Sequence, residues 1–408
     1  MGSPEMDRPT PVAVTDETEE PMSSIHTRRG LTVVALSTAL ATSLAATAVA
    51  QDEKVELTML ADNTEGTMAW TEALVDAYEE VNPNVSISIE WRPGGGDGDN
   101  IVKTRLATGE MADIFRYNSG SLFQALNPTE TLVDLSGEAF MENVSDAFLP
   151  SVTAGDGVYG VPLGTAMGGG ILYNKAIYED LGLSVPTSWD EFAANNAAIK
   201  EAGIAPVGAS FADTWTSQLF VLSDYYNVES AEPGFADRYT NNEAKYATSE
   251  AAIKGFEYTQ QGYDEGWWQE DFDVTTFGEA VGLLAEGEIA HYPMLTFALG
   301  EISNTYPEAV DDIGFFAQPG TADANGATIW MTDGTYIPQT SENIDAAKDF
   351  LAYVASVEAT EVMSAAQSPA GPYLIDGATL PDDAMPALLD LQAYIDAGAA
   401  FPALEFLS

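Results

Sequence analysis

The chain has 408 residues, 46% of them hydrophobic and 10% aromatic, so it is long enough to bury a large core and is expected to form two domains. Its 64 acidic and 14 basic residues give a formal charge of −50, which repels nucleic acids and anionic membrane surfaces and argues against nucleic-acid binding. Salt screens such self-repulsion, so the charge suggests a saline habitat, although secreted proteins kept soluble by charge share this balance.

Residues 1–50 have the pattern of an export signal with a leader before it. A twin arginine precedes an uncharged run over residues 30–50, and Ala48-Val49-Ala50 at the end of this run gives the small-residue pattern that signal peptidase cuts. The mature chain is therefore predicted to begin at Gln51. Residues 1–21 are acidic and unusual before such a signal, so Met22 is an alternative start. A transmembrane anchor is the competing interpretation, but no stop-transfer charges follow the run.

Cysteine is absent from the whole chain. This absence excludes disulfides, thiolate metal sites, a cysteine nucleophile and a lipid-modified cysteine after the signal. We therefore predict an exported protein, periplasmic or extracellular, that is not anchored to lipid through cysteine.

The first part of the mature chain predicts alternating strands and helices. Residues 55–60 alternate as a strand, a helix follows the polar turn at 62–66, and residues 85–91 form a second strand. The loop at 94–99 partly matches one calcium repeat, but such repeats need stacked copies, so we favour a flexible connector before a helix capped by Asn100. This alternation predicts a parallel sheet that binds ligands at the carboxyl ends of its strands.

The centre of the chain is a glycine-rich crossing. It contains Gly164 and the triple glycine Gly168, Gly169 and Gly170, and it leads into a short apolar strand at 171–173. Such a segment can act as a hinge or let a ligand approach the backbone closely. An ordinary glycine-bearing loop is the alternative, and composition alone favours it.

The remaining patterns predict more helices and strands of the same kinds. Helices are expected at residues 188–199, 213–226, 246–266, 277–286, 344–357 and 385–397, and strands at 204–207, 289–294 and 313–316. The apolar run at 401–408 suggests a shortened C-terminus.

Most catalytic chemistries lack the residues that they require. The chain has no G-x-S-x-G elbow, H-x-x-x-H pair, EF-hand loop, P-loop or dinucleotide fingerprint, and His291 is the single histidine of the mature chain. We therefore predict no metal, no cofactor and no enzymatic activity. A secreted glycoside hydrolase is the remaining enzyme alternative, because two carboxylates suffice for that reaction.

Aromatic residues at expected loop positions suggest a carbohydrate ligand. Aromatic faces suit the C–H faces of sugar rings, while Asn, Asp, Arg and Glu match sugar hydroxyls. Packing in the core is the alternative for at least half of the tryptophans. The aromatic residues in question are Tyr117, Trp215, Trp267, Trp268, Tyr292 and Trp330.

Five segments carry a family resemblance. They are VELTMLADNTEGT at 55–67, GEMADIFRYNSGSLFQAL at 109–126, YGVPLGTAMGGGILYNKAIYEDLGLSVPTSWDEF at 159–192, GEIAHYPM at 287–294 and GTYIPQTSENIDAAKDFLAYV at 334–354. The resemblance covers nearly all of the mature chain, and the third segment is its most specific part. The chain resembles the extracellular solute-binding proteins of carbohydrate ABC importers, the class that includes maltose-binding proteins.

The resemblance implies an α/β protein with the two-lobed periplasmic binding protein type II fold, each lobe a sheet flanked by helices, with the ligand cleft between the lobes. Lobe one would take residues 52–163 and 330–366, and lobe two 164–329 and 367–408. It implies a monomeric receptor that closes about its hinge over a sugar, most readily an oligosaccharide, and delivers it to the permease subunits of an ABC importer. A receptor of the same fold for another solute, such as a polyamine, is the alternative.

The resemblance also implies the ligand contacts. Arg116 departs from the family pattern, because relatives carry an aromatic residue there, and the residues beside Met294 lack the tryptophan of maltose-type proteins. Arg116 would bind an acidic sugar or neutral hydroxyls, or would instead pair with a nearby carboxylate. The chain also ends before the last helix of such proteins, which predicts a weakened second lobe. The implied contacts are Asn63, Thr64, Glu65, Arg116, Asn118, Ser119, Trp215, Tyr292, Met294, Trp330 and Asp333.

Overall fold

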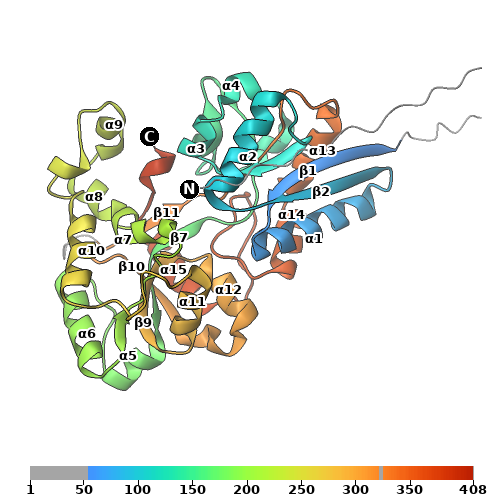
Figure 1. The fold of residues 1–408 in the computed structure, drawn as a ribbon. Helices are drawn as coiled ribbons and strands as arrows, with labels where there is room; N and C mark the ends of the chain where they lie inside the picture. Colours follow the sequence, from blue (N-terminus) through green and yellow to red (C-terminus); the bar gives the residue numbers. More distant parts are fainter. Residues whose placement is uncertain (1–53, 321–324, 408) are drawn as a thin grey trace, which may run out of the picture. The chain divides into compact units, whose positions relative to one another are not determined.

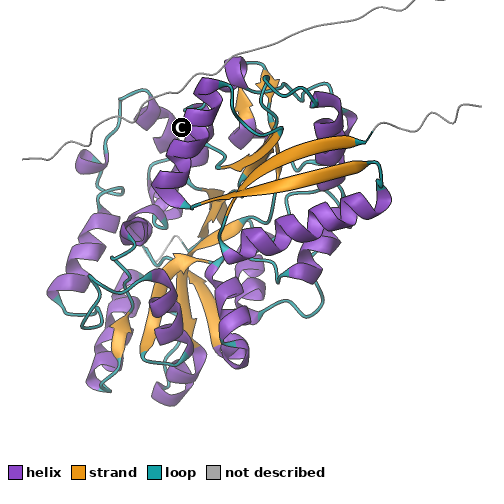
Figure 2. Cartoon of the chain, turned by 45° about the vertical axis from the view of Figure 1, so that its right-hand side comes forward, coloured by secondary structure: helices purple, strands orange, loops and turns teal. Residues whose placement is uncertain are grey.

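Two β-sheets with flanking helices organise the chain in a computed structural model that describes residues 54–320 and 325–407 (Figure 1). The predicted α/β class is confirmed, and helices lie beside both sheets (Figure 2). The predicted leader and signal over residues 1–50, with the alternative start at Met22, lie outside the described residues. No described helix combines the length and the apolar character needed to cross a membrane.

The first sheet is built mainly from the N-terminal part of the chain. Strand β1 pairs in parallel with both β2 and β3, as the alternating pattern predicted, and β12 pairs antiparallel with β3 and β6. Helices α1 and α13 pack beside β1, and α14 packs on α1. The elements are β1 (Val55–Asp62), α1 (Glu65–Val81), β2 (Val85–Arg92), α2 (Gly95–Thr108), β3 (Ile114–Tyr117), β6 (Gly160–Pro162), β12 (Gly334–Tyr336), α13 (Ile344–Val354) and α14 (Val357–Ala366).

The second sheet has the order β13-β11-β7-β9-β8, with β10 also paired to β7. Its strands are almost entirely buried in the middle of the sheet, as expected for strands covered by helices on both faces. The strands are β7 (Met167–Asn174), β8 (Ala205–Val207), β9 (Ile289–Leu295), β10 (Ile313–Ala317), β11 (Ala327–Trp330) and β13 (Ala400–Pro402). Its helices include α5 (Lys175–Leu181), α6 (Trp189–Glu201), α10 (Lys254–Asp264), α11 (Phe277–Ala285), α12 (Ala298–Thr305) and α15 (Pro386–Asp396).

Short elements complete the described fold. They are α3 (Ser121–Gln124), α4 (Pro128–Thr131), η1 (Ala139–Asn143), η2 (Leu149–Val152), β4 (Thr153–Ala154), β5 (Gly157–Val158), η3 (Thr214–Gln218), α7 (Leu219–Leu222), α8 (Tyr225–Ala231), α9 (Phe235–Thr240), η4 (Tyr246–Thr248), η5 (Pro307–Asp312) and η6 (Leu404–Phe406).

The chain crosses between the two sheets more than once. It leaves the first sheet between β6 and β7, returns between β11 and β12, and reaches the second sheet again at β13. Each sheet therefore draws strands from distant parts of the sequence. The residue boundaries given above for the two lobes stay a prediction.

The flexible connector predicted at 94–99 is wrong, because helix α2 already begins at Gly95. Asp97 lies in its first turn, where the helix dipole favours a carboxylate. At Gly98 a Cβ would collide with the carbonyl oxygen of Pro93, so this glycine serves close packing inside the helix. The helix ends at Gly109, which is left-handed with a φ of 72° and accordingly suits glycine.

Three predicted helices are interrupted in the structure. Between η4 and α10 the hydroxyl of Ser249 accepts the N–H of Ala252 at 2.9 Å, and between α13 and α14 Ser356 caps Ala359 at 3.1 Å. The helix predicted at 213–226 is likewise divided into η3, α7 and α8.

The triple glycine belongs to strand β7 and is not a flexible crossing, as its sequence had suggested. Gly169 pairs with Thr328 on one side and Leu295 on the other, so its backbone is held by two neighbouring strands. A Cβ at Gly169 would collide with the ring of Trp330, which explains the need for glycine. Gly164 differs, because it lies between β6 and β7 with a φ of 116° that side chains disfavour. The hinge role stays a prediction, and Gly164 is its best-placed member.

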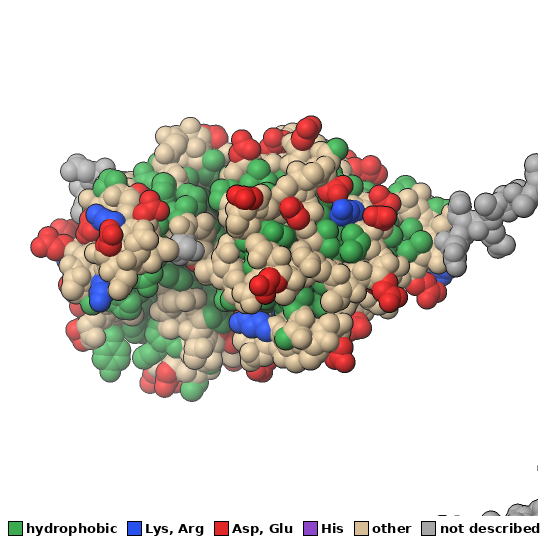
Figure 3. Space-filling view, turned by 90° about the horizontal axis from the view of Figure 1, so that it is seen from above, with side chains coloured by type: hydrophobic (Ala, Val, Ile, Leu, Met, Phe, Trp, Pro, Cys, Tyr) green, Lys and Arg blue, Asp and Glu red, His purple; other side chains and the backbone are tan. Residues whose placement is uncertain are grey.

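Acidic side chains are spread over the face of the molecule that Figure 3 shows. Figure 3 shows Asp and Glu over the whole of the viewed face, with Lys and Arg much sparser among them. The charge therefore does not mark one site by itself.

Candidate functional site

A buried arginine joins three strands at one edge of the first sheet. Arg116 of β3 is 9% exposed, and its Nη1 donates to the carboxylate of Asp62 at the end of β1 and, at 2.8 Å, to the hydroxyl of Thr67. The same nitrogen lies 3.2 Å from Oδ2 of Asp333, directly before β12. Of the alternatives for Arg116, the structure therefore contains the pairing with carboxylates.

Asp62 is held in its ionised form. Burial by itself raises the pKa of Asp62, but the charge of Arg116 and the hydrogen bonds from Thr64 outweigh it and set the pKa at about 2. Thr64 donates from its hydroxyl to Asp62 Oδ1 at 2.6 Å and from its backbone N–H at 3.2 Å. The carboxylate thus fixes the turn between β1 and α1.

Asp333 is only partly compensated by Arg116. Burial raises the pKa of Asp333, the charge of Arg116 opposes this, and the neighbouring carboxylate of Asp62 adds to the increase. Its side chain is 23% exposed, whereas that of Asp62 is 8% exposed. Asp333 therefore offers a partly exposed carboxylate beside a buried positive charge.

The sequence reasoning missed Arg92, which ends β2 beside β1. Its Nη2 donates to the backbone oxygen of Arg116 at 3.3 Å, and its guanidinium lies 6.0 Å from the ring centroid of Tyr117. The signal was available, because arginines are rare in the mature chain and β2 was expected next to β1.

The loops after β1 and β3 bring several predicted contacts to the same edge of the sheet. Asn63 and Thr64 are exposed, and Glu65 begins α1, although its side chain lies outside what the structure describes. Asn118 is half-buried, and its backbone oxygen accepts the hydroxyl of Tyr336 at 3.2 Å. Ser119 is buried and donates to the backbone oxygen of Thr332 at 2.7 Å. This bond ties the loop to the returning crossing.

Three aromatic rings form a shelf on the side of the second sheet. We call Trp215, Phe277 and Phe297 the aromatic shelf. Trp215 is 39% exposed, and its ring centroid lies 5.7 Å from that of Phe277 and 5.9 Å from that of Phe297. The two phenylalanine rings are 5.2 Å apart. The sequence indicated Trp215 but missed both phenylalanines, whose proximity depends on tertiary structure.

Backbone and side-chain hydrogen bonds hold the shelf in place. The N–H of Phe277 donates to Asp213 Oδ2 at 2.7 Å, which ties helix α11 to the turn that carries Trp215. Thr296, directly before Phe297, accepts the N–H of Gly168 at 2.9 Å and donates to the backbone oxygen of Ala370 at 2.6 Å. The shelf is therefore preorganised, which reduces the entropy lost when a ligand stacks on it.

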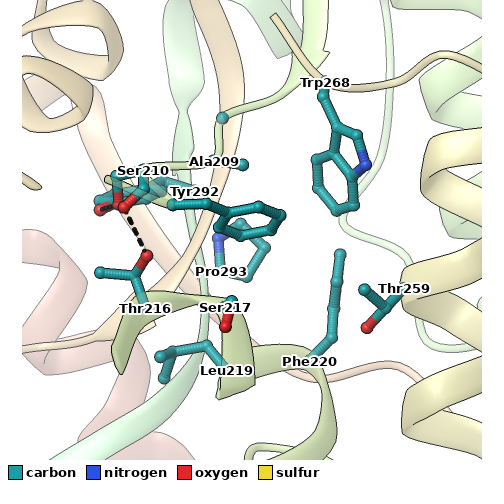
Figure 4. A pocket seen from close by; sticks show the side chains of 12 residues that line it. Ala209, Ser210, Thr216, Ser217, Leu219, Phe220, Thr259, Trp268, Tyr292 and Pro293 are labelled. Carbon is teal, nitrogen blue, oxygen red and sulfur yellow. Dashed lines mark hydrogen bonds between the residues drawn. The ribbon is translucent and has the colours of Figure 1, made fainter. Parts of the chain in front are cut away.

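Tyr292 and Met294 of β9 are buried in this structure. The hydroxyl of Tyr292 lies 2.6 Å from that of Ser210, at one side of a small pocket that Trp268 and Phe220 also line (Figure 4). The free space there holds about one water molecule. The predicted contact of Tyr292 and Met294 with a ligand gains no support from this geometry and stays a prediction.

The other indicated aromatic residues serve mainly packing. Trp267 is 1% exposed and Tyr117 is fully buried, as the alternative of core packing predicted for part of the set. Trp330 is 7% exposed, and a side-chain hydrogen bond from it opposes the increase that burial causes in the pKa of Glu405. Sequence reasoning missed Glu405, because nothing in the pattern of the terminal segment links it to Trp330.

His291 is placed for packing. It is fully buried, and its Nε2 lies 2.7 Å from the hydroxyl of Tyr178. Burial lowers the pKa of His291 to about 3, so the ring is neutral at physiological pH. Across the described residues, no group of three His, Cys, Asp or Glu side chains is arranged to hold a metal ion.

The family model of the bacterial extracellular solute-binding proteins matches residues 61–361. The chain belongs to this family. This solute-binding protein is 23% identical over 341 residues to the multiple sugar-binding protein of Streptococcus mutans, a match that covers 81% of this chain and 79% of the relative.

Solved structures of the family share the fold. RafE in complex with raffinose is 22% identical with a TM-score of 0.71, covering 86% of this chain and 90% of that structure. A chitin oligosaccharide binding protein is 22% identical with a TM-score of 0.74, covering 87% and 90%. These likenesses confirm the two-lobed α/β fold of this solute-binding protein.

Proposed function

We propose that the protein is an exported receptor that binds a sugar, most readily a neutral oligosaccharide, and delivers it to the permease of an ABC importer without breaking a bond. The observation that carries this proposal is the aromatic shelf. The exposed ring of Trp215, supported by two partly buried phenylalanine rings, suits the apolar face of a sugar ring. Family membership and the names of its sugar-binding relatives support the same conclusion.

The polar edge of the first sheet supplies the complementary hydrogen bonds. Asn63 and Thr64 are exposed there, and Asp333 adds a partly exposed carboxylate. Arg116 is already occupied by two carboxylates, so it positions Asp333 and does not attract an acidic sugar. The balance of charges therefore favours a neutral saccharide over a uronic acid.

Closure about the crossings would enclose the sugar between shelf and polar edge. Gly164 supplies the conformational freedom at one crossing. Export follows from the signal pattern of residues 1–50, and a carbohydrate and permease subunits are the expected partners of a monomeric receptor.

The test is a thermal-shift and calorimetric screen of the mature chain from Gln51, in high salt, against raffinose, stachyose, chitotriose, galactose, galacturonic acid and putrescine. A ligand at a hundredfold excess over its Kd stabilises the fold by about 2.7 kcal/mol, which corresponds to a rise of roughly 4 °C in a chain of this size. The sugar is recovered afterwards, and its cleavage would contradict the proposal in favour of a hydrolase.

A variant series connects the binding to the shelf. Trp215→Ala is expected to weaken binding of the selected sugar about tenfold, because a stacking contact of about 1.5 kcal/mol is lost. The matched control is Tyr263→Ala, which removes another aromatic residue, 62% exposed, from helix α10. Equal effects of both substitutions on affinity would contradict the assignment of the shelf.

A further inference from the structure

The C-terminal segment is firmly attached to the second sheet. Strand β13 pairs in parallel with β11, and the N–H of Ala403 donates to the backbone oxygen of Ile329 at 2.8 Å. The ring of Phe401 packs 6.2 Å from that of Tyr225 between centroids. This attachment fixes where the following turn η6 lies (Figure 1).

The same segment also contacts the first sheet, at the loop after β3. A Cβ added at Gly120 would lie 2.7 Å from the backbone oxygen of Glu405 and 2.7 Å from Cδ1 of Phe406. Gly120 has a φ of 68°, so both its conformation and the space around it require glycine. The ring of Phe406 thus rests on the backbone of the loop that carries Asn118 and Ser119.

Glu405 connects this contact to the returning crossing. A side-chain hydrogen bond from Trp330, three residues before Asp333, acts on the pKa of Glu405. Burial raises the pKa of Glu405, the hydrogen bond from Trp330 opposes this, and the charge of Asp333 adds to the increase. Among the described residues no Lys or Arg forms an ion pair with Glu405.

We propose that Glu405 and Phe406 form a latch that joins the second sheet to the loop after β3 and positions the binding residues on both sides of it. The proposal rests on the proposed function, because the positioned residues are those assigned to the sugar. Phe406 would hold the loop of Asn118 and Ser119, and Glu405 would fix Trp330.

The latch has a direct consequence for affinity. A ligand that contacts both sheets binds only when they are held together, and its apparent Kd rises as the fraction of molecules in that arrangement falls. Loss of the ring at Phe406 removes a contact between the sheets without removing a predicted ligand contact. A drop of the competent fraction to about one tenth would therefore weaken binding about tenfold.

The absence of cysteine allows a clean distance measurement. Thr104→Cys on α2 and Glu243→Cys after α9 introduce two exposed labelling sites, one near each sheet. In the ligand-free mature chain, Phe406→Ala is expected to lower energy transfer between dyes at these sites, and Phe406→Leu to lower it less. The control is Leu389→Ala, which removes a 56% exposed side chain from helix α15. Unchanged transfer in a folded Phe406→Ala chain would overturn the latch.

The role of Glu405 is tested by rescue. Glu405→Ala removes the acceptor of the indole hydrogen bond, whereas Glu405→Gln keeps an acceptor oxygen. The emission of Trp330 is obtained by subtracting the spectrum of a Trp330→Phe chain. We expect Glu405→Ala to change this emission and Glu405→Gln to retain most of the original emission. Emission unaffected by Glu405→Ala would overturn this half of the proposal.

Affinity completes the test and separates the two proposals. For the sugar that the unaltered chain binds, Phe406→Ala and Glu405→Ala are expected to raise the Kd three- to tenfold, with Glu405→Gln and Leu389→Ala close to the unaltered chain. If the unaltered chain binds no sugar, the proposed function fails, while energy transfer and fluorescence still decide the latch. Unchanged affinity together with reduced transfer would overturn its positioning role.

Discussion

Replacing Arg116 with methionine is expected to unfold the protein more easily, because the substitution leaves Asp62 and Asp333 without their shared cation. Methionine keeps most of the apolar stem, so the loss is mainly electrostatic. Breaking a buried ion pair by removing one partner costs about 3–5 kcal/mol, and we expect a value in this range, since the side chains of Arg116 and Asp62 are 11% and 8% exposed.

The dependence on pH gives the same prediction a second test. The pKa of Asp62 is lowered to about 2 in the folded chain. A lowered carboxylate pKa stabilises the fold above the unfolded pKa of about 4, and this contribution is lost as the pH falls from about 4 to about 2. Lowering the pKa from about 4 to about 2 corresponds to roughly 2 kcal/mol in the free energy of unfolding. In Arg116→Met, the free energy of unfolding should fall less between about pH 4 and about pH 2 than in the unaltered chain.

The assay is urea unfolding of the mature chain at pH 7 and at a series of values down to pH 2. The control is Arg105→Met, whose exposed pair with Glu90 is expected to contribute less than about 1 kcal/mol. Adding Asp62→Asn to Arg116→Met should recover part of the loss, because it removes the unpaired charge. The reasoning is refuted if Arg116→Met retains full stability at pH 7 but loses sugar affinity, which would make Arg116 a direct ligand contact.

Two further predictions concern the second sheet and its surroundings. Burial raises the pKa of Asp224 to about 8, although the hydrogen bond from Asn227 opposes this increase. The folded chain therefore loses stability as the pH rises from about 4 to about 8. Asp224→Asn should reduce this loss of stability in melting curves. A steeper loss in the variant would contradict this. Gly169→Ala should cost about 1–3 kcal/mol in urea unfolding, because its Cβ meets the ring of Trp330, whereas Gly278→Ala in α11 has open space and should be neutral or stabilising by up to about 1 kcal/mol.

Local periodicity predicted the parallel core of the first sheet correctly, since β1 and β2 alternate with helices whose apolar faces recur at helical spacing. It failed where one side chain decides a boundary. Ser356 caps the helix that follows it, the hydroxyl of Ser249 accepts the N–H of Ala252 before α10 begins, and the glycines of β7 pair on both sides although glycine is a poor strand former. The pairing of the glycines is a tertiary contact that overrides the local preference, whereas the serine hydrogen bonds are themselves local.

The residues of the candidate site were also predictable only in part. Residues after strand ends were predictable, because strand ends meet at one edge of a sheet. The partners of Arg116 could not be predicted, because Asp62 and Asp333 are far from it in sequence. A guanidinium can form its hydrogen bonds with a carboxylate or with a sugar, so the residue type does not decide between them. Phe277 and Phe297 were missed for a similar reason, as neither has a sequence signal that separates a shelf from ordinary core packing.

The strand order of the first sheet has a consequence for when the protein can fold. Strand β12, at residues 334–336, lies between β3 and β6, so the sheet is incomplete until most of the chain has been synthesised. Pairings so distant in sequence form slowly, because a long loop must close before the contact stabilises it. On the proposed export route, this order keeps the emerging chain from completing its first sheet early, and late folding is what passage through a membrane channel as an extended polypeptide requires.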